Sequence, residues 1–359
     1  MPTTDVELDG TVRAIARLFD AYERVFAAGR AGRSLSRSRP VRRAGFDLQL
    51  RLAGREVVAE DVVALTLVDR AGRLLPSWTP GAHLDVFLPS GRLRQYSLCG
   101  DPADRSQYRV AVRRIAEGNG GSVEIHDELE AGAIIRVRGP RNAFRLVDAP
   151  SYLFVAGGIG ITPILPMVRS VAAAGKPWRL VYLGRSAASM PFLDELARCE
   201  GGDVLLHHDD GDGFADVAAI LGELNALPPV PDLYVCGPPA LMDTARQLLR
   251  AIDPMAPVFS ERFSALPVVG GEPFTIELAQ SGATVEVAAD ETALAAIRRV
   301  LPDVRYSCQQ GFCRTCKCRV LDGQVEHRDR HVLVDRERDD SMLICVSRAP
   351  QGERLVLDL

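Results

Sequence analysis

Residues 152–168, YLFVAGGIGITPILPMV, combine a continuous apolar run, a glycine-rich turn and the start of a helix. Further apolar runs and helical patterns share this region, the runs at 179–183, 203–207 and 232–236 and the helical patterns at 164–175 and 240–252. Runs without polar alternation are typical of strands that are buried on both faces. Strands that alternate with helices predict a doubly wound α/β domain with a parallel sheet, which we place at residues 150–264.

Two turns that follow strands of this domain are candidates for binding a dinucleotide. Glycines in GGIGITP (157–163) allow a pyrophosphate to approach the backbone, and the start of the next helix favours its negative charge. The second turn, at 236–238, follows another strand of the sheet, so Cys236 would lie beside the nicotinamide. The predicted nucleotide-binding residues are Gly157, Gly158, Gly160, Thr162, Pro163, Cys236, Gly237 and Pro238. The alternatives are a turn that serves only the fold and a Cys236 that is simply a small buried residue.

The choice between NADH and NADPH depends on the end of the second strand. An acidic residue there often binds the ribose 2′-hydroxyl of NADH, whereas arginine suits the 2′-phosphate of NADPH. The sequence has Gly184-Arg185-Ser186 at this position, so Arg185 by itself favours NADPH. Asp210, in the string HHDDG, either faces the nucleotide as well or only caps a turn.

Residues 45–149 have a different pattern. Short segments rich in β-branched residues and separated by Gly or Pro lie at 46–52, 62–69, 83–88, 108–115 and 133–139. No long helical pattern lies between them, which predicts an antiparallel β-barrel.

This barrel contains the parts that a flavin site needs. In RQYSL (94–98), Arg94 supplies a positive charge, Tyr96 an aromatic wall and Ser97 a hydroxyl for the reactive N5 edge of the ring. The string GNGGS (118–122) follows a strand, and its Gly120, Gly121 and Ser122 would open a helix whose amides bind a phosphate.

Five of the eight cysteines lie in the last fifth of the chain. Cys308, Cys313 and Cys316 have the spacing C-x₄-C-x₂-C, and Cys345 follows at a distance, which is the plant-type arrangement that binds a 2Fe–2S cluster. A structural zinc site with four cysteines is the alternative, but zinc ligands usually form two C-x₂-C pairs. Cys318 fits no ligand position, and we expect it to be a small apolar residue that faces the adjoining strand.

The remaining segments complete the domain organisation. Residues 265–359 add two strands, at 274–278 and 284–288, and a helix at 291–301 before the cysteines. Residues 1–44 predict an amphipathic helix at 9–29 and then a linker with six arginines, for which a docking arm is the alternative.

The net charge of −4 argues against a nucleic-acid partner. No apolar run approaches the roughly 20 residues of a membrane span, and no signal peptide is visible, so we expect a cytoplasmic protein.

Taken in order, RQYSL, GNGGS, GGIGITP, VCGPPALM and the terminal C-x₄-C-x₂-C…C resemble the phthalate dioxygenase reductase family from about residue 45 to Leu359. The resemblance implies an FMN-binding barrel, an NADH-binding sheet and an α+β β-grasp ferredoxin domain. It implies that Phe263, in SERF (260–263), covers the flavin ring, with a core phenylalanine as the alternative. GNGGS followed by His126 favours FMN over FAD, and the family favours NADH over NADPH. Arg314 departs from the glycine that the family commonly has between its second and third ligand cysteines.

The resemblance implies an NAD(P)H-dependent oxidoreductase that passes single electrons from NADH, through FMN and a 2Fe–2S cluster, to a separate oxygenase. That oxygenase would be a Rieske-type enzyme or a haem monooxygenase. We expect Ser97, Cys236 and Phe263 to lie where hydride is transferred, and we expect the reductase to be a monomer. An iron–sulfur redox sensor and a stand-alone reductase of small acceptors are the alternative functions.

Overall fold

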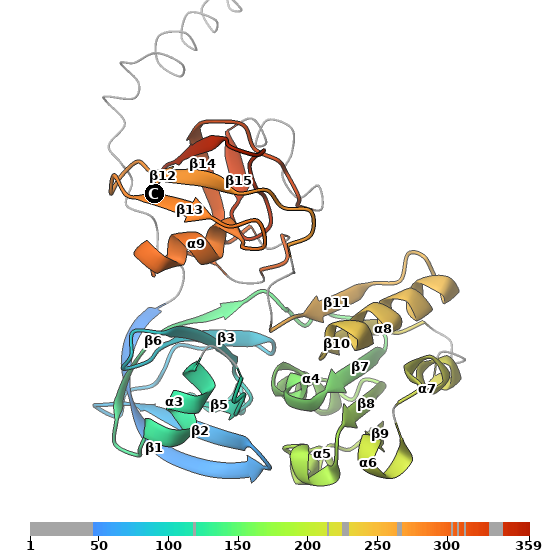
Figure 1. Cartoon of the computed structure of the whole chain (residues 1–359). Helices are drawn as coiled ribbons and strands as arrows, with labels where there is room; N and C mark the ends of the chain where they lie inside the picture. Colours follow the sequence, from blue (N-terminus) through green and yellow to red (C-terminus); the bar gives the residue numbers. More distant parts are fainter. Residues whose placement is uncertain are drawn as a thin grey trace, which may run out of the picture. The chain divides into compact units, whose positions relative to one another are not determined.

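The computed structural model describes residues 46–117, 120–213, 215–224, 230–263, 268–302, 304–306, 309–311, 314–329 and 340–359. These residues belong to one compact unit, residues 45–359. The helix expected at 9–29, the arginine-rich linker and the predicted ligands Cys308 and Cys313 lie outside the described residues. The described residues build three sheets, which follow one another along the chain (Figure 1).

The first sheet is antiparallel and closes on itself. Its strands are β1 (Phe46–Ala59), β2 (Val62–Asp69), β3 (Ala82–Phe87), β4 (Leu93–Ser97), β5 (Gln107–Arg113) and β6 (Ile134–Asn142). They follow the order β4-β3-β6-β1-β2-β5. A β-bridge between Leu98 and Val110 joins the end of β4 to β5, the two outer strands of that order. The antiparallel barrel predicted from the sequence is confirmed.

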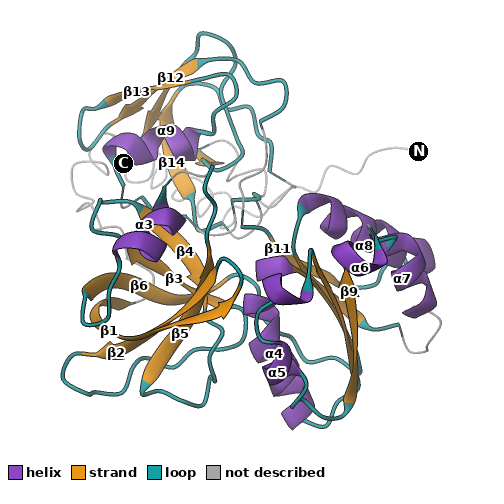
Figure 2. Ribbon diagram, turned by 60° about the horizontal axis from the view of Figure 1, so that its bottom comes forward, coloured by secondary structure: helices purple, strands orange, loops and turns teal. Residues whose placement is uncertain are grey.

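The second sheet is parallel, as predicted. Its strands are β7 (Tyr152–Gly157), β8 (Trp178–Gly184), β9 (Gly202–His208), β10 (Asp232–Cys236) and β11 (Val258–Glu261), in the order β11-β10-β7-β8-β9. Alternate residues of β7 enter two different hydrophobic clusters, Phe154 with residues of helix α4 and Val155 with residues of helix α8. Helices therefore cover both faces of the sheet (Figure 2).

The helices of this domain are α4 (Ile161–Ala173), α5 (Leu193–Leu196), α6 (Asp209–Asp212), α7 (Val217–Leu224) and α8 (Pro239–Ile252). One expectation about the strands is wrong. The apolar run at 203–207 was expected to be buried on both faces, but in β9 Val204 is 37% and Leu206 40% exposed. The physical reason is that β9 is the edge strand of the sheet, which pairs on one side with β8.

The third sheet is mixed and packs on one helix. Its strands are β12 (Phe274–Leu278), β13 (Thr284–Val287), β14 (Lys317–Asp322), β15 (Ser341–Leu343) and β16 (Arg354–Leu357), in the order β13-β12-β16-β14-β15. β12 and β16 are parallel and the other pairs are antiparallel. Helix α9 (Ala293–Val300) supplies Leu294 and Ile297 to the core of this unit. We call β12–β16 with α9 the ferredoxin unit. None of the described helices is long and apolar enough to span a membrane.

A buried arginine holds the ferredoxin unit together. Arg348 is 1% exposed, and its guanidinium donates to the carbonyl oxygens of Glu272, Ala288 and Glu291. It also lies over the ring of Phe274, 5.1 Å from the centroid. These carbonyls belong to the segments on either side of β12 and β13, so one buried side chain ties three backbone positions together.

Replacing this arginine should therefore loosen the ferredoxin unit. Arg348→Met removes three donors at once, and we expect the local free energy of unfolding to fall by about 3 kcal/mol or more. The measurement is hydrogen exchange of peptides that cover β12 and β16 in the full-length protein. Arg354→Met is the matched control, because Arg354 is exposed and pairs with Glu277 at the surface, which should cost less than about 1 kcal/mol. Equal protection in the two variants would contradict a structural role for Arg348.

Candidate functional site

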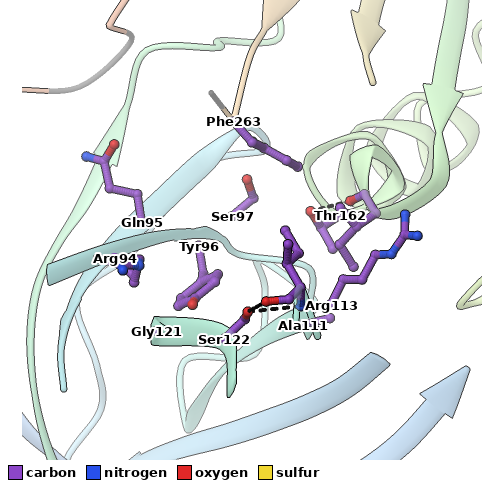
Figure 3. Close-up of a pocket in the computed structure, with 12 residues that line it drawn as sticks. Arg94, Gln95, Tyr96, Ser97, Ala111, Arg113, Gly121, Ser122, Thr162 and Phe263 are labelled. Carbon is purple, nitrogen blue, oxygen red and sulfur yellow. Dashed lines mark hydrogen bonds between the residues drawn. The ribbon is translucent and has the colours of Figure 1, made fainter. Parts of the chain in front are cut away.

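A cavity of about 300 Å³ lies where the barrel meets the parallel sheet. It is lined by residues of β4, of β5 and the segment after it, of α3 (Gly121–Glu128), and of the turn before α4 and the start of that helix. These residues are Arg94, Gln95, Tyr96, Ser97, Ala111, Arg113, Ile115, Gly121, Ser122, Ile159 and Thr162, together with Phe263. Figure 3 shows Tyr96 on one side of this space and Phe263 on the other. Seven residues predicted from separate motifs are thus brought together.

Phe263 is not a core residue. It is 50% exposed and lines the cavity two residues after the end of β11. The alternative of a core phenylalanine at a strand end is therefore excluded. A half-exposed aromatic ring beside Ser97 is suited to cover a planar ligand.

The start of α3 has the geometry of a phosphate site. Gly120, the N-cap, has a φ of 74°, which favours glycine. A Cβ on Gly121 would lie 2.5 Å from Nε of Arg94, so the side chain of Arg94 packs directly against the start of α3. The hydroxyl of Ser122 accepts a hydrogen bond of 3.0 Å from the amide of Ile115, so it holds the preceding loop in place. First-turn amides with an arginine beside them fit a phosphate group.

Glu124 fixes this helix, and the sequence motifs did not identify it. Its carboxylate is buried and accepts hydrogen bonds from the amide and hydroxyl of Ser90 and from Arg92. Burial alone would raise the pKa of Glu124, but the bonds from Ser90 and Arg92 outweigh it and hold the pKa below its usual value. The one local signal was an acidic residue in the first turn of a helix.

Ser97 contacts Glu261, which is the second residue of the site that the sequence motifs did not identify. Its hydroxyl donates to a carboxylate oxygen of Glu261 at 3.3 Å. Glu261 ends β11 and lies directly beside Cys236, at the end of β10. Burial raises the pKa of Glu261 to about 8, and burial, followed by the charge of Glu261, raises the pKa of the Cys236 thiol. Near neutral pH the structure therefore places a mainly neutral carboxyl and an un-ionised thiol next to Ser97.

The glycine turns of the parallel sheet pack against each other. A Cβ on Gly160 would lie 2.1 Å from the carbonyl oxygen of Cys236, and a Cβ on Gly157 would lie 2.6 Å from Pro238. A Cβ on Gly237 would lie 3.0 Å from the amide nitrogen of Gly157. These three glycines are required by turn-to-turn contact, whether or not a pyrophosphate is bound. Gly158, with a φ of 53°, is required by its backbone conformation.

The other predicted nucleotide residues lie around these turns. Thr162 donates from its hydroxyl to the carbonyl of Ile159 at 3.0 Å, and Pro163 is buried in the first turn of α4. Arg185 and Asp210 follow β8 and β9, and the amide of Asp210 donates to the carbonyl of Arg185 at 2.9 Å. The two candidates for contact with the ribose are therefore neighbours, although neither lines the cavity.

Two of the four predicted cluster ligands are described, and they are close to each other. Cys316 and Cys345 are 3% and 2% exposed and share one hydrophobic cluster. The amide of Ile344 donates to the carbonyl of Cys316 at 3.4 Å, so the two ligand segments are adjacent. Cys318 is buried in β14, where burial raises the pKa of its thiol and its residue pairs with Met342 of β15.

Three described residues of the ligand loop have backbones in the left-handed region. Gln309, Gly311 and Arg314 have φ values of 53°, 75° and 60°. A Cβ on Gly311 would lie 2.7 Å from a methyl carbon of Val346 in the segment after Cys345, so the loop packs tightly against that segment. This backbone, with two buried thiols beside it, fits a metal–sulfur cluster enclosed by a tight loop.

A family model described as a 2Fe-2S iron-sulfur cluster binding domain matches residues 276–350. Over 322 residues the chain is 40% identical to the phthalate dioxygenase reductase of Burkholderia cepacia, covering 88% of this chain and 98% of that protein. The chain belongs to the phthalate dioxygenase reductase family. This reductase is also 38% identical to the phthalate 4,5-dioxygenase oxygenase reductase subunit of Pseudomonas putida, covering 86% of this chain and 96% of the relative.

Solved structures agree with this assignment. A structure described as phthalate dioxygenase reductase, a modular structure for electron transfer from pyridine nucleotides to [2Fe-2S], has a TM-score of 0.66 and 39% identity, and the match covers 87% of this chain and 98% of that one. An intact type IV self-sufficient cytochrome P450 monooxygenase has a TM-score of 0.68 and 41% identity, covering 90% of this chain and 43% of the P450 chain. The reductase is thus an oxidoreductase of the oxygenase-reductase type, as the sequence predicted.

The carboxyl group of Glu261 should make the stability of this reductase depend on pH. With a pKa raised from 4.5 to about 8, the folded protein keeps a proton that the unfolded chain releases, so the free energy of unfolding should fall as the pH rises between these values. Glu261→Gln is neutral throughout and should gain stability relative to the native protein from pH 5 to pH 9. The measurement is urea unfolding of both proteins across this range, with exposed Glu200→Gln as the control. A constant difference between Glu261→Gln and the native protein would show that the carboxyl is ionised when folded.

Proposed function

We propose that this reductase takes hydride from NADH at the cavity between barrel and parallel sheet and delivers single electrons, through FMN and a 2Fe–2S cluster, to a separate oxygenase. The observation that carries the proposal is the mixed lining of that cavity. Tyr96 and Ser97 of the barrel face the same space as Ile159 and Thr162 of the nucleotide turn. A flavin held by the former residues would therefore meet a nicotinamide held by the latter.

Each residue around the cavity has a separate task in this proposal. Arg94 and the first-turn amides at Gly121 and Ser122 would bind the FMN phosphate, and Tyr96 and Phe263 would contact the ring system. When bound, the flavin would accept two electrons as hydride and release them one at a time. The string GNGGS (118–122) followed by His126 supports FMN, with FAD as the alternative.

Ser97 lines the cavity, and Glu261 and Cys236 lie next to it outside the lining. The hydroxyl of Ser97 is held by Glu261, which orients it toward the space that the flavin edge would occupy. Because the carboxyl group is mainly neutral near pH 7, it adds no negative charge where hydride arrives. Cys236 is fully buried behind this pair, so its proposed role is to pack the hydride-transfer site and exclude water from it.

NADH is the proposed electron donor, with NADPH as the alternative. Family membership supports NADH, and Asp210 beside Arg185 supplies an acid near the ribose position. Cys308, Cys313, Cys316 and Cys345 are the proposed cluster ligands. The proposed domains are residues 45–149 for flavin, 150–264 for nucleotide and 265–359 for the cluster, preceded by an amino-terminal segment at 1–44.

The proposed recipient is a Rieske-type oxygenase or a haem monooxygenase. Relatives named as reductases of phthalate dioxygenase support the former, and the matched P450 chain supports the latter. We also propose that the reductase acts as a monomer in the cytoplasm.

The cluster should be needed for one-electron acceptors but not for the flavin reaction. Cys316→Ser should abolish the visible signature of the cluster and lower NADH-driven reduction of cytochrome c by about tenfold or more, whereas ferricyanide reduction continues from the flavin. The measurements are iron content, electron paramagnetic resonance and both steady-state rates. Cys318→Ser, two residues away in β14, is the matched control and should keep the cluster. Loss of the cluster in the control and its retention in Cys316→Ser would reverse the ligand assignment.

Delivery to the oxygenase should depend on the exposed Arg314. It lies two residues before Cys316, so a charge here steers the encounter with an acceptor at the cluster loop. Arg314→Glu should slow reduction of the partner oxygenase by about tenfold at low salt and less at high salt, with ferricyanide reduction unchanged. The measurement is stopped-flow reduction of that oxygenase at several ionic strengths.

The matched control for this test is Arg354→Glu. β14 and β16 are antiparallel, so Arg354 lies toward the Asp322 end of β14 and away from Cys316. Both variants replace an arginine with a glutamate, but Arg314 lies at the cluster loop and Arg354 lies away from it. Equal slowing in the two variants would assign the effect to net charge rather than to a docking face at the cluster loop.

A further inference from the structure

The first residue of β4 joins the barrel to the ferredoxin unit. The side chain of Leu93 is 4% exposed and belongs to the same hydrophobic cluster as Ile297 and Tyr306. Phe87, which pairs with Leu93 across β3 and β4, packs against this cluster as well. The ferredoxin unit therefore rests on the strand that carries the proposed flavin residues.

The carbonyl of Leu93 receives hydrogen bonds from both sides of this contact. Nη1 of Arg94, which lines the flavin cavity, donates to it at 2.9 Å. Nη2 of Arg298, on helix α9 of the ferredoxin unit, donates to the same oxygen at 3.2 Å. One backbone acceptor thus couples an arginine of the cavity to an arginine of the ferredoxin unit, 205 residues further from Leu93 in the sequence.

Arg298 in turn holds the segment that leads to the cluster. Its guanidinium lies over the ring of Tyr306, 4.5 Å from the centroid, in cation–π geometry. Tyr306 is 3% exposed and lies two residues before Cys308, a proposed cluster ligand. Its phenol is also within electrostatic reach of Asp85 and Arg94 of the barrel. The contacts run without a gap from the flavin cavity through Leu93 and Arg298 to Tyr306.

A comparison with Arg299, the adjacent residue on α9, shows what is particular to Arg298. Arg299 is 51% exposed, pairs with Glu291 and donates to the carbonyl of Glu286, both within the ferredoxin unit. Arg298 is half-buried and reaches the barrel instead. This difference indicates that Arg298 stabilises the contact between the barrel and the ferredoxin unit, and not helix α9 alone.

We propose that Arg298 is a positioning residue for electron transfer from flavin to cluster, because it clamps the Tyr306 segment onto the first residue of β4. This inference rests on the proposed function. The step it controls is a one-electron transfer in which the cluster gains the electron that the reduced flavin loses, and no bond forms or breaks. NADH supplies the electrons. The clamp fixes the separation and orientation of the two groups, on which the rate of such a transfer depends.

The test is Arg298→Gln in the full-length, cofactor-loaded protein. After rapid mixing with NADH, the flavin-reduction phase should keep its native rate, and the following phase of cluster reduction should slow about tenfold or more, since a misplacement of about 1 Å can cost about a hundredfold in an oriented reaction. Cluster content, paramagnetic resonance spectrum and reduction potential should stay native. Hydrogen exchange should rise in peptides that cover β4 and α9. This rise would show, independently of turnover, that the contact between the barrel and the ferredoxin unit has opened.

Two further variants make the outcome decisive. Arg299→Gln, the matched control, should leave both phases and the exchange pattern native. Arg298→Lys keeps the charge but loses the planar stack on Tyr306, so its cluster-reduction rate should be intermediate. A native rate of cluster reduction in Arg298→Gln overturns the proposal, and if that variant lacks the cluster, a native rate in Arg298→Lys overturns it equally. A slow flavin-reduction phase in the native protein would instead count against the proposed function.

Discussion

Strand β4 carries the constraint on which the rest of the structure depends. At its first residue the carbonyl of Leu93 accepts a hydrogen bond from the ferredoxin unit, and at its last residue the hydroxyl of Ser97 donates to Glu261 of the parallel sheet. Arg94 and Tyr96, between them, face the cavity. Five residues of extended chain span only about 13 Å from first to last Cα. A single rigid strand therefore brings the nucleotide turn, the flavin site and the path to the cluster within a short distance of one another.

The barrel side of this arrangement is built to resist movement. Glu124 ties α3 to the turn that precedes β4, and Arg94 donates a hydrogen bond to the carbonyl of Leu93. The same strand pairs with β3, whose next partner is β6. A charged site is useful only if its groups keep their positions when the ligand binds, since reorganisation would cancel part of the electrostatic stabilisation. The buried hydrogen bonds around β4 supply that rigidity.

Much of the architecture could be predicted from local sequence. Periodicity identified the strands of the barrel and the parallel sheet, and GGIGITP identified the turn before α4, because both depend on residues close together in the chain. The spacing of the cysteines was enough by itself to indicate the cluster. Exposure of β9 was missed, because whether an apolar strand lies inside a sheet or at its edge depends on strand order and not on its own composition.

Only the tertiary structure decided which distant side chains meet. Glu261 and Arg298 look like ordinary charged residues at a strand end and on an amphipathic helix. Their importance follows from bonds to Ser97 and Leu93, which lie 164 and 205 residues away in the sequence. The sequence pattern assigns the glycines at 157, 160 and 237 to nucleotide binding, and the structure adds contact between the two turns as a sufficient reason for them. A sequence thus determines what each segment is, because dihedral preferences and ligand spacing are local. Pairing of segments, and with it the pKa of a buried acid or the partner of an arginine, is set by packing between parts of the chain that no short motif records.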